Sequence, residues 1–241
     1  MKHKLLYQNI KQYLVSQLFG ASRSKRWKKA QLGEFEWWRE IAGKGYNGRT
    51  RDEFVSVSQR GWMLSQLKFL EKPFDSWKDG IIVEFGSGPA GFVEYIEAKQ
   101  KIAIEPLIDH YRKVFPHLAK SNVEYWNCPA EDVGHLLDNI ADLVICFNVL
   151  DHTRDPNRVI QNLARAAKTG ADLLFQVNVY LSDEQIRKKF KKHAEIHPHS
   201  FFPETILSML RMNRFDIRKQ QLSEELDVNG ECFFICAGVK I

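Results

Sequence analysis

Cysteine is scarce in this sequence, and no long hydrophobic segment is present. The four cysteines among 241 residues lie at 128, 146, 232 and 236, a density and spacing that suit neither a disulfide framework nor a structural zinc site. We therefore expect buried free thiols in a reducing compartment. No apolar run reaches the roughly 20 residues that cross a bilayer, and the first residues contain no secretory core. These absences predict a cytoplasmic protein without a membrane span.

The sequence also has little excess charge of either sign. Lys and Arg number 35 and Asp and Glu number 30, which gives a formal net charge of +5. Part of this charge lies in two basic clusters, residues 22–29 and 187–192. Such clusters attract nucleic acid, anionic lipid or phosphorylated substrates, but solvated helix faces are the more common explanation. We therefore do not expect nucleic acid as a partner.

What the sequence does contain is enough apolar material for one core and an extension, since 44% of the residues are hydrophobic. Residues 1–78 have apolar positions at helical spacing, several tryptophans and no strand pattern, which predicts a helical N-terminal cap or lid. From residue 79 to 241, short apolar runs alternate with amphipathic stretches, as in a parallel sheet with helical crossovers. The predicted strands are 81–85, 102–105, 123–126, 142–147, 173–177, 215–219 and 232–239.

The end of the chain departs from this alternation. Residues 219 and 232 are joined by a loop containing Asp227-Val-Asn-Gly230, which is too short for a crossover helix. The last two strands should therefore be antiparallel neighbours. The predicted fold is α/β, a doubly wound sheet of about seven strands with the last strand antiparallel, plus the helical N-terminal cap.

A glycine-rich segment follows the first predicted strand. Gly86-Ser-Gly-Pro-Ala-Gly91 fits the G-x-G-x-x-G pattern of a tight turn that opens a helix, and Glu105 ends the next strand. This pattern fits a nicotinamide dinucleotide and S-adenosylmethionine equally well. Glu84 would repel a pyrophosphate but favour an ammonium group, and Pro89 has no N–H to give to a phosphate. Glu84 and Pro89 thus favour S-adenosylmethionine over a nicotinamide dinucleotide.

From residue 81 to 241 the sequence resembles the class I S-adenosylmethionine-dependent methyltransferases, especially the bacterial small-molecule branch. The resemblance is carried by Val83–Gly91, Ile102–Pro106, Asn127–Asp132 and Asp142–Pro156. It implies a Rossmann-like fold, ribose binding by Glu105, an adenine contact at Ala130 and Glu131, and a methionine contact at Phe147 and Asn148. For Glu131, capping of a helix is an alternative. The full set of cofactor-binding residues that we predict is Glu84, Gly86, Ser87, Gly88, Ala90, Glu105, Pro106, Ala130, Glu131, Phe147 and Asn148.

Three histidines are candidate catalytic groups, because methyl transfer to a hydroxyl is assisted by a base of near-neutral pKa. His152 follows the fourth strand, and His197 and His199 lie in a substrate-side insertion at about 180–203. His152 could instead only pack near the cofactor, and the histidine run could dock the insertion through Phe201 and Phe202. With His193, the run could also hold a metal, but without an evident set of carboxylates we predict no metal.

The expected reaction is methyl transfer to an oxygen, in preference to a nitrogen, of a small molecule such as a sugar or a phosphorylated glycan precursor. Aromatic and basic residues between 35 and 62 suggest a lid over an anionic or sugar-containing substrate, although packing explains Trp37 and Trp38 better. The alternatives are a nucleic-acid methyltransferase or binder, an NAD(P)-dependent oxidoreductase, and a cofactor-binding regulator without turnover.

Overall fold

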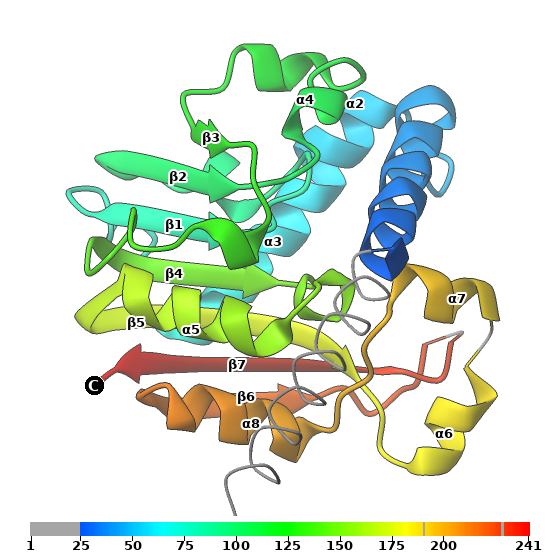
Figure 1. Cartoon of the computed structure of the whole chain (residues 1–241). Coiled ribbons are helices and arrows are strands. Elements are labelled where there is room, and N and C mark those ends of the chain that lie inside the picture. The colour runs from blue at the N-terminus through cyan, green and yellow to red at the C-terminus, as the bar shows by residue number, and fades with distance from the viewer. Residues whose placement is uncertain (1–24, 190, 228) are drawn as a thin grey trace, which may run out of the picture.

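Seven strands form one sheet in the order β3-β2-β1-β4-β5-β7-β6 (Figure 1). The computed structural model describes residues 25–189, 191–227 and 229–241. Strands β1 to β5 are parallel, and β7 runs antiparallel to both β5 and β6. The predicted α/β sheet with its antiparallel last strand is therefore confirmed. The strands are β1 (Ile81–Phe85), β2 (Gln100–Ile104), β3 (Glu124–Trp126), β4 (Ala141–Phe147), β5 (Ala167–Val179), β6 (Phe215–Leu222) and β7 (Cys232–Lys240).

The position of each strand in the sheet follows from its hydrophobic pattern. Residues 82–85 of β1 are all buried, as expected of a central parallel strand that is covered on both faces. Strand β6 at the sheet edge instead alternates between buried or half-buried and exposed residues along most of its length. Three of the four cysteines, Cys146, Cys232 and Cys236, are buried free thiols in the central strands β4 and β7.

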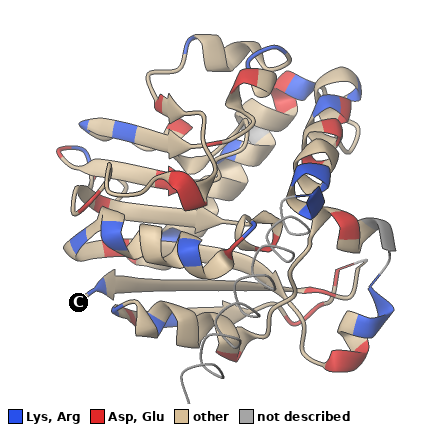
Figure 2. Cartoon of the chain, in the orientation of Figure 1, with Lys and Arg blue, Asp and Glu red and all other residues tan. Residues whose placement is uncertain are grey.

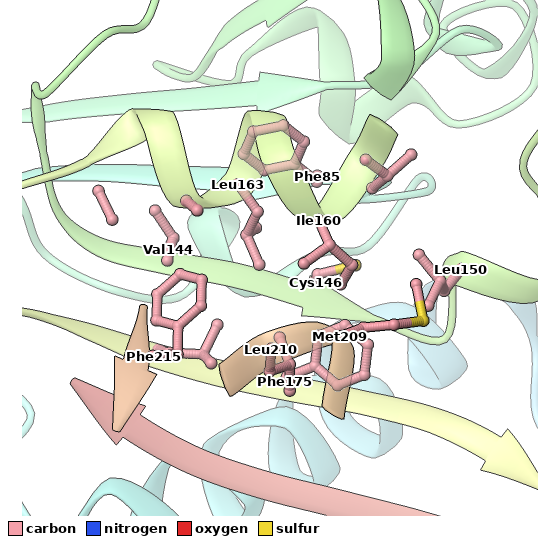
Figure 3. Close-up of a cluster of buried hydrophobic side chains, with 14 of the residues drawn as sticks. Phe85, Val144, Cys146, Leu150, Ile160, Leu163, Phe175, Met209, Leu210 and Phe215 are labelled. Carbon is pink, nitrogen blue, oxygen red and sulfur yellow. The ribbon is translucent and has the colours of Figure 1, made fainter. Parts of the chain in front are cut away.

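One face of the sheet is covered by α5 (Pro156–Ala166) and α8 (Pro203–Met212). Helix α5 begins where the sequence indicates, because Asp155 accepts a hydrogen bond from the Arg158 amide and Pro156 occupies the first turn. Its buried side chains meet those of the strands in the main core, in which Ile160 and Leu163 lie beside Val144 and Phe175 (Figure 3).

The opposite face is covered by helices that precede β1. A helix formed by α2 (Arg51–Glu53), a π-helical segment (Phe54–Gln59) and α3 (Arg60–Leu67) continues into a 3-10 turn (Lys68–Leu70). Met63 and Leu67 of α3 pack in the same hydrophobic cluster as buried residues of the strands. The N-terminal helix, residues 25–44, instead stands beside the carboxyl ends of the strands. The division at residue 78 stays a prediction.

The helix expected after the glycine segment is absent, and a single 3-10 turn, Phe92–Glu94, takes its place. Residues 92–99 as an α-helix would rise only about 12 Å, whereas the five-residue strand that they must run back along is about 16 Å long. The segment therefore returns mostly without helix.

The remaining elements are short. The predicted insertion contains α6 (Asp183–Lys188) and α7 (Lys191–Ile196). The other helical turns are α4 (Ile108–Tyr111) and the 3-10 turns Pro116–Ala119, Ala130–Asp132 and Leu150–His152.

No helix in the described part of the chain is long and apolar enough to cross a membrane. Location in the cytoplasm stays a prediction.

The packing of α5 predicts the effect of truncating its central leucine. Leu163 is fully buried, so Leu163→Ala should lower the free energy of unfolding by about 3 kcal/mol through lost burial and a residual cavity. The control is Leu136→Ala, because Leu136 is 74% exposed and should tolerate the change. Urea denaturation of both variants measures the difference, and equal midpoints would contradict the core assignment.

Candidate active site at the carboxyl edge of the sheet

A cavity of about 580 Å³ lies at the carboxyl ends of β1, β2 and β4, on the side where the N-terminal helix stands. Residues that directly follow these three strands line it, together with Gln176 and Asn178 near the end of β5. Because β7 is antiparallel, its beginning reaches the same edge and adds Phe233. The N-terminal helix and the π-helical segment contribute Trp27, Gln31, Glu34, Trp37, Trp38, Phe54 and Gln59.

The glycine segment forms a tight loop against the neighbouring strand ends. Gly86 and Gly88 have positive φ angles of 72° and 57°, a conformation that glycine adopts without strain. The Gly86 amide donates to the Ile104 carbonyl at 2.7 Å, which continues the hydrogen bonding of β1 to β2 past the end of the strand. The Gly88 amide donates to Glu105 Oε2 at 2.9 Å. The loop and Glu105, the residue predicted to bind the ribose, therefore hold each other in place.

Glu105 is buried at the floor of the cavity and keeps both carboxylate oxygens on backbone donors. In addition to the Gly88 bond, Oε1 accepts from the Leu107 amide at 2.9 Å. Burial raises the pKa of Glu105 to about 7, although these two hydrogen bonds act in the opposite direction. A cation arriving in the cavity would therefore favour the charged form of this group.

Glu84 lies beneath the glycine loop and is not among the residues that line the cavity. Its Oε2 accepts from the Val93 amide at 3.0 Å, and burial raises its pKa to about 7. Gly91 is required here, because a Cβ at this position would lie 2.6 Å from Glu84 Oε2. Ala90 also lies outside the lining, in a cluster with Trp38 of the N-terminal helix. Glu84 and Ala90, which the sequence predicts as cofactor contacts, therefore do not face the cavity.

The other predicted cofactor residues come together around one space. The 3-10 turn after Pro129 presents Ala130 and Glu131, and Glu131 Oε1 accepts from the Asp155 amide at 3.1 Å. Glu131 therefore binds the backbone just before α5, and it does not cap its own 3-10 turn, which has no side-chain cap. The predicted residues that line the cavity are Gly86, Ser87, Gly88, Glu105, Pro106, Ala130, Glu131, Phe147 and Asn148.

The three predicted catalytic histidines occupy different positions. Only His152 lines the cavity, and its Nδ1 lies 3.8 Å from Glu34 Oε2. His197 lies directly behind it, with ring centroids 4.3 Å apart, and burial lowers the pKa of His197 to about 4. His199 Nε2 donates to the Thr153 carbonyl at 2.8 Å and its ring stacks on Phe201, which is the docking role considered as an alternative.

Several residues of the site were missed from the sequence. Asp151 precedes His152 and is 2% exposed, and neither of its carboxylate oxygens has a hydrogen-bond partner among the described residues. Gln176 Oε1 is also buried without a partner in that part of the chain. The position of Asp151 beside His152 was a usable signal. Glu34 also lines the cavity, and its Oε1 accepts from Trp38 Nε1 at 2.8 Å. No sequence motif around Glu34 indicates this role.

The charge of the cavity differs from that of the whole chain. Within the described residues, Glu34, Glu105 and Glu131 line it, but no lysine or arginine does. Figure 2 shows Lys and Arg distributed over several elements and interspersed with Asp and Glu. In the two basic clusters, Lys29 pairs with Glu195 at 2.9 Å and Lys188 with Glu184 at 2.6 Å. The lining thus favours neutral or cationic ligands over anionic ones.

Known proteins resemble the chain in sequence and in fold. A family model described as a methyltransferase domain matches residues 59–220. A ubiquinone biosynthesis O-methyltransferase from Pseudoalteromonas translucida is 41% identical over 54 residues, which span 22% of this chain and only 23% of that relative.

Solved structures share the fold at low sequence identity. The N-methyltransferase NodS from Bradyrhizobium japonicum, in complex with S-adenosyl-L-homocysteine, aligns with a TM-score of 0.61 at 15% identity, over 88% of this chain and 98% of its own. A SAM-dependent methyltransferase from Thermotoga maritima aligns with a TM-score of 0.56 at 20% identity, over 79% and 93% of the two chains.

The geometry of the glycine loop predicts that Gly86 does not tolerate a side chain. In Gly86→Ala the new Cβ would lie 2.6 Å from Val149 Cγ1 and closer still to Cγ2, at a φ of 72°. We expect a loss of about 2 kcal/mol in the free energy of unfolding. Gly61→Ala is the matched control, because no atom lies within 4 Å of its added Cβ. If denaturation midpoints of the two variants coincide, the loop geometry is wrong.

Proposed function

Because the chain belongs to the methyltransferase domain family and S-adenosylmethionine is its methyl donor, we propose that it methylates a hydroxyl oxygen of an uncharged small molecule bound beside His152. The glycine pattern alone fits both a nicotinamide dinucleotide and S-adenosylmethionine. Membership in the methyltransferase family selects S-adenosylmethionine and excludes the NAD(P)-dependent oxidoreductase. The observation that carries the proposal is the cavity itself. One end is built from the glycine loop and Glu105, and His152 lies farther along its lining beside Glu34.

The donor occupies the end of the cavity formed after β1, β2 and β3. Each oxygen of Glu105 accepts one backbone hydrogen bond and retains a lone pair for a ribose hydroxyl. Ala130 and Glu131 face the adenine, and Phe147 and Asn148 lie beside the methionine part. Glu84 acts indirectly, since it holds the turn after the loop through the Val93 amide.

The acceptor lies beyond β4, against His152 and the aromatic side chains of the cap. Trp27, Trp62 and Phe233 offer flat apolar surfaces, which suit a phenol or the apolar face of a sugar. The buried Oε1 of Gln176 needs a donor, which a hydroxyl or an amine of a bound molecule supplies. The absence of lysine and arginine from the described lining does not favour the phosphorylated acceptor expected from the sequence.

Methyl transfer is an in-line displacement in which the acceptor oxygen attacks the methyl carbon, the bond to the sulfonium sulfur breaks, and one proton leaves the hydroxyl. The donor is already activated, so the enzyme contributes positioning, exclusion of water and a route for this proton. His152 is the basic side chain of the described lining, and the proton therefore leaves at the His152 end of the cavity. Oxygen as the acceptor atom is supported by the relative named an O-methyltransferase.

The acceptor class is tested by measuring S-adenosylhomocysteine release with a panel of compounds. The panel contains a catechol, a monophenol, a neutral sugar, a sugar phosphate and an aromatic amine. We expect turnover with at least one neutral hydroxyl compound and none with the sugar phosphate. Turnover confined to the amine would refute oxygen as the acceptor, and rapid turnover of the sugar phosphate would refute the charge argument.

Donor binding should release protons just below neutral pH. Burial raises the pKa of Glu84 and of Glu105 to about 7, so both are partly protonated in the free enzyme. The positive sulfonium favours their charged forms, which lowers both pKa values and expels protons. Calorimetry of S-adenosylmethionine binding in buffers of different ionisation enthalpy measures the number of protons released on binding.

Glu105→Gln should bind the donor more weakly and release fewer protons, because an amide cannot ionise. Glu204→Gln is the control, since Glu204 is an exposed carboxylate on α8 and should change neither quantity. Unchanged affinity and proton release in Glu105→Gln would remove Glu105 from the donor site.

Replacing His152 should slow turnover without loss of donor affinity. We expect His152→Ala to lower kcat about 100-fold, since a group that assists proton loss contributes on this order. Equilibrium binding of S-adenosylmethionine should stay within about twofold of the wild type. His135→Ala is the control, because its side chain is 84% exposed and is not among the residues that line the cavity. An unchanged kcat in His152→Ala would leave catalysis to positioning alone.

A further inference from the structure

We infer that Asp151, His152 and His197 form a binding site for one divalent transition-metal ion, contrary to the expectation from the sequence that no metal is bound. Asp151 and His152 belong to the 3-10 turn after β4, and His197 directly follows α7 in the insertion. One potential ligand atom from each of the three lies within 4.8 Å of the other two. Residues about 45 positions apart in sequence thus converge on one point.

The carboxylate of Asp151 is the first reason to place a cation there. Its side chain is 3% exposed, and neither oxygen has a hydrogen-bond partner among the described residues. The closest basic atoms are His152 Nε2 at 3.9 Å from Oδ1 and His197 Nε2 at 3.8 Å from Oδ2. A buried carboxylate without a partner is costly, and a bound cation removes that cost.

The tautomer of His197 is the second reason. Its Nδ1 lies 3.2 Å from the His193 carbonyl oxygen, and only a protonated Nδ1 can donate to a carbonyl. With the proton on Nδ1, Nε2 of a neutral ring carries a lone pair, and it lies 3.8 Å from Asp151 Oδ2. Two lone pairs that face each other repel unless a positive ion lies between them.

His152 is arranged in a similar way. Its Nε2 faces Asp151 and its Nδ1 faces the Glu34 carboxylate. In metal sites, a ligating imidazole commonly gives its other N–H to a carboxylate or a backbone carbonyl, which fixes the ring and its tautomer. The His193 carbonyl is such an outer partner of His197, whereas Glu34 Oε2 lies 3.8 Å from His152 Nδ1, beyond hydrogen-bond distance among the described residues.

The donor set and the spacing indicate the kind of ion. Ligand atoms about 2.1 Å from a tetrahedral ion lie about 3.4 Å apart. The spacings here are 3.9 Å from Asp151 Oδ1 to His152 and 3.8 Å from Asp151 Oδ2 to His197, and the three ligand atoms lie within 4.8 Å of one another, so side-chain movements accompany binding of the ion. Two imidazoles and one carboxylate suit zinc or iron better than calcium or magnesium. Three protein ligands leave a position for water or an acceptor oxygen.

A catalytic role for this ion rests on the proposed function, whereas its binding does not. His152 is the ligand that the cavity shares with the ion. The catalytic role requires the open position of the ion to face the cavity: an acceptor hydroxyl bound there would lose its proton more readily, because the ion acts as a Lewis acid, and the proton would pass to solvent. His152 would then promote proton loss as a ligand rather than as the base itself.

The test is metal binding by the full chain without an affinity tag. Protein freed of metal with a chelator is titrated with Zn²⁺ by calorimetry and with Co²⁺ by visible absorption, in the absence of donor and acceptor. We expect one ion per chain, and a tetrahedral cobalt spectrum that Zn²⁺ abolishes. Asp151→Asn and His197→Gln should each weaken binding by more than about 100-fold, because loss of even an outer partner costs up to about that factor. His135→Ala should bind as the wild type does.

Absence of a stoichiometric ion in the wild type would overturn the site, and so would equal affinity in Asp151→Asn and His197→Gln. The wild-type cobalt spectrum decides the question even if a variant fails to fold. Methyl transfer is assayed separately, with and without chelator. If the ion binds but the chelator leaves the rate unchanged, the site stands and its catalytic role is refuted. If no acceptor is found, the proposed function fails while the binding result is unaffected.

Discussion

The parallel pairing of β1 with both β2 and β4 is the constraint on which the site depends. The chain leaves β1 toward β2 and β3 on one side and returns to β4 and β5 on the other. Connections on the two sides therefore diverge at the carboxyl edge, and a crevice opens between them, as is general for such sheets. The segments after β1, β2, β3 and β4 all border this crevice, which is why residues from four separate motifs line one cavity.

Burial of charge distinguishes the two ends of the site. Glu84 and Glu105 are buried, but each accepts backbone hydrogen bonds that offset part of the desolvation cost. Both belong to the rigid surroundings of the glycine loop and would serve any donor with a positive centre. Asp151 is equally buried and has no such bonds among the described residues. A buried group of this kind needs an explanation, and the metal ion that we infer at Asp151 supplies one.

The strands and the glycine-loop end of the cavity could be predicted because their signals are local. A run such as Ile81–Phe85 is apolar throughout since both faces of β1 are covered, and its observed bounds match the predicted ones. The glycine loop could be located from the conformations that its glycines permit. The helix predicted after the glycine loop is replaced by a 3-10 turn at Phe92–Glu94. The distance that the chain must cover between β1 and β2 decides this, and the apolar pattern of the sequence contains no information about that distance.

The acceptor half could not be predicted, because its walls come from segments whose positions are set by distant contacts. Helix 25–44 touches α7 closely: a Cβ on Gly33 would lie 2.9 Å from Ile196 Cγ1, and Lys29 pairs with Glu195. One segment before β1 and one segment after β5 thus meet over the same edge of the sheet. The family match begins only at residue 59, so Trp27, Glu34 and Trp38 lie outside it. Family membership therefore fixes the chemistry of the donor, whereas the surroundings of the acceptor also include side chains that this family model does not cover.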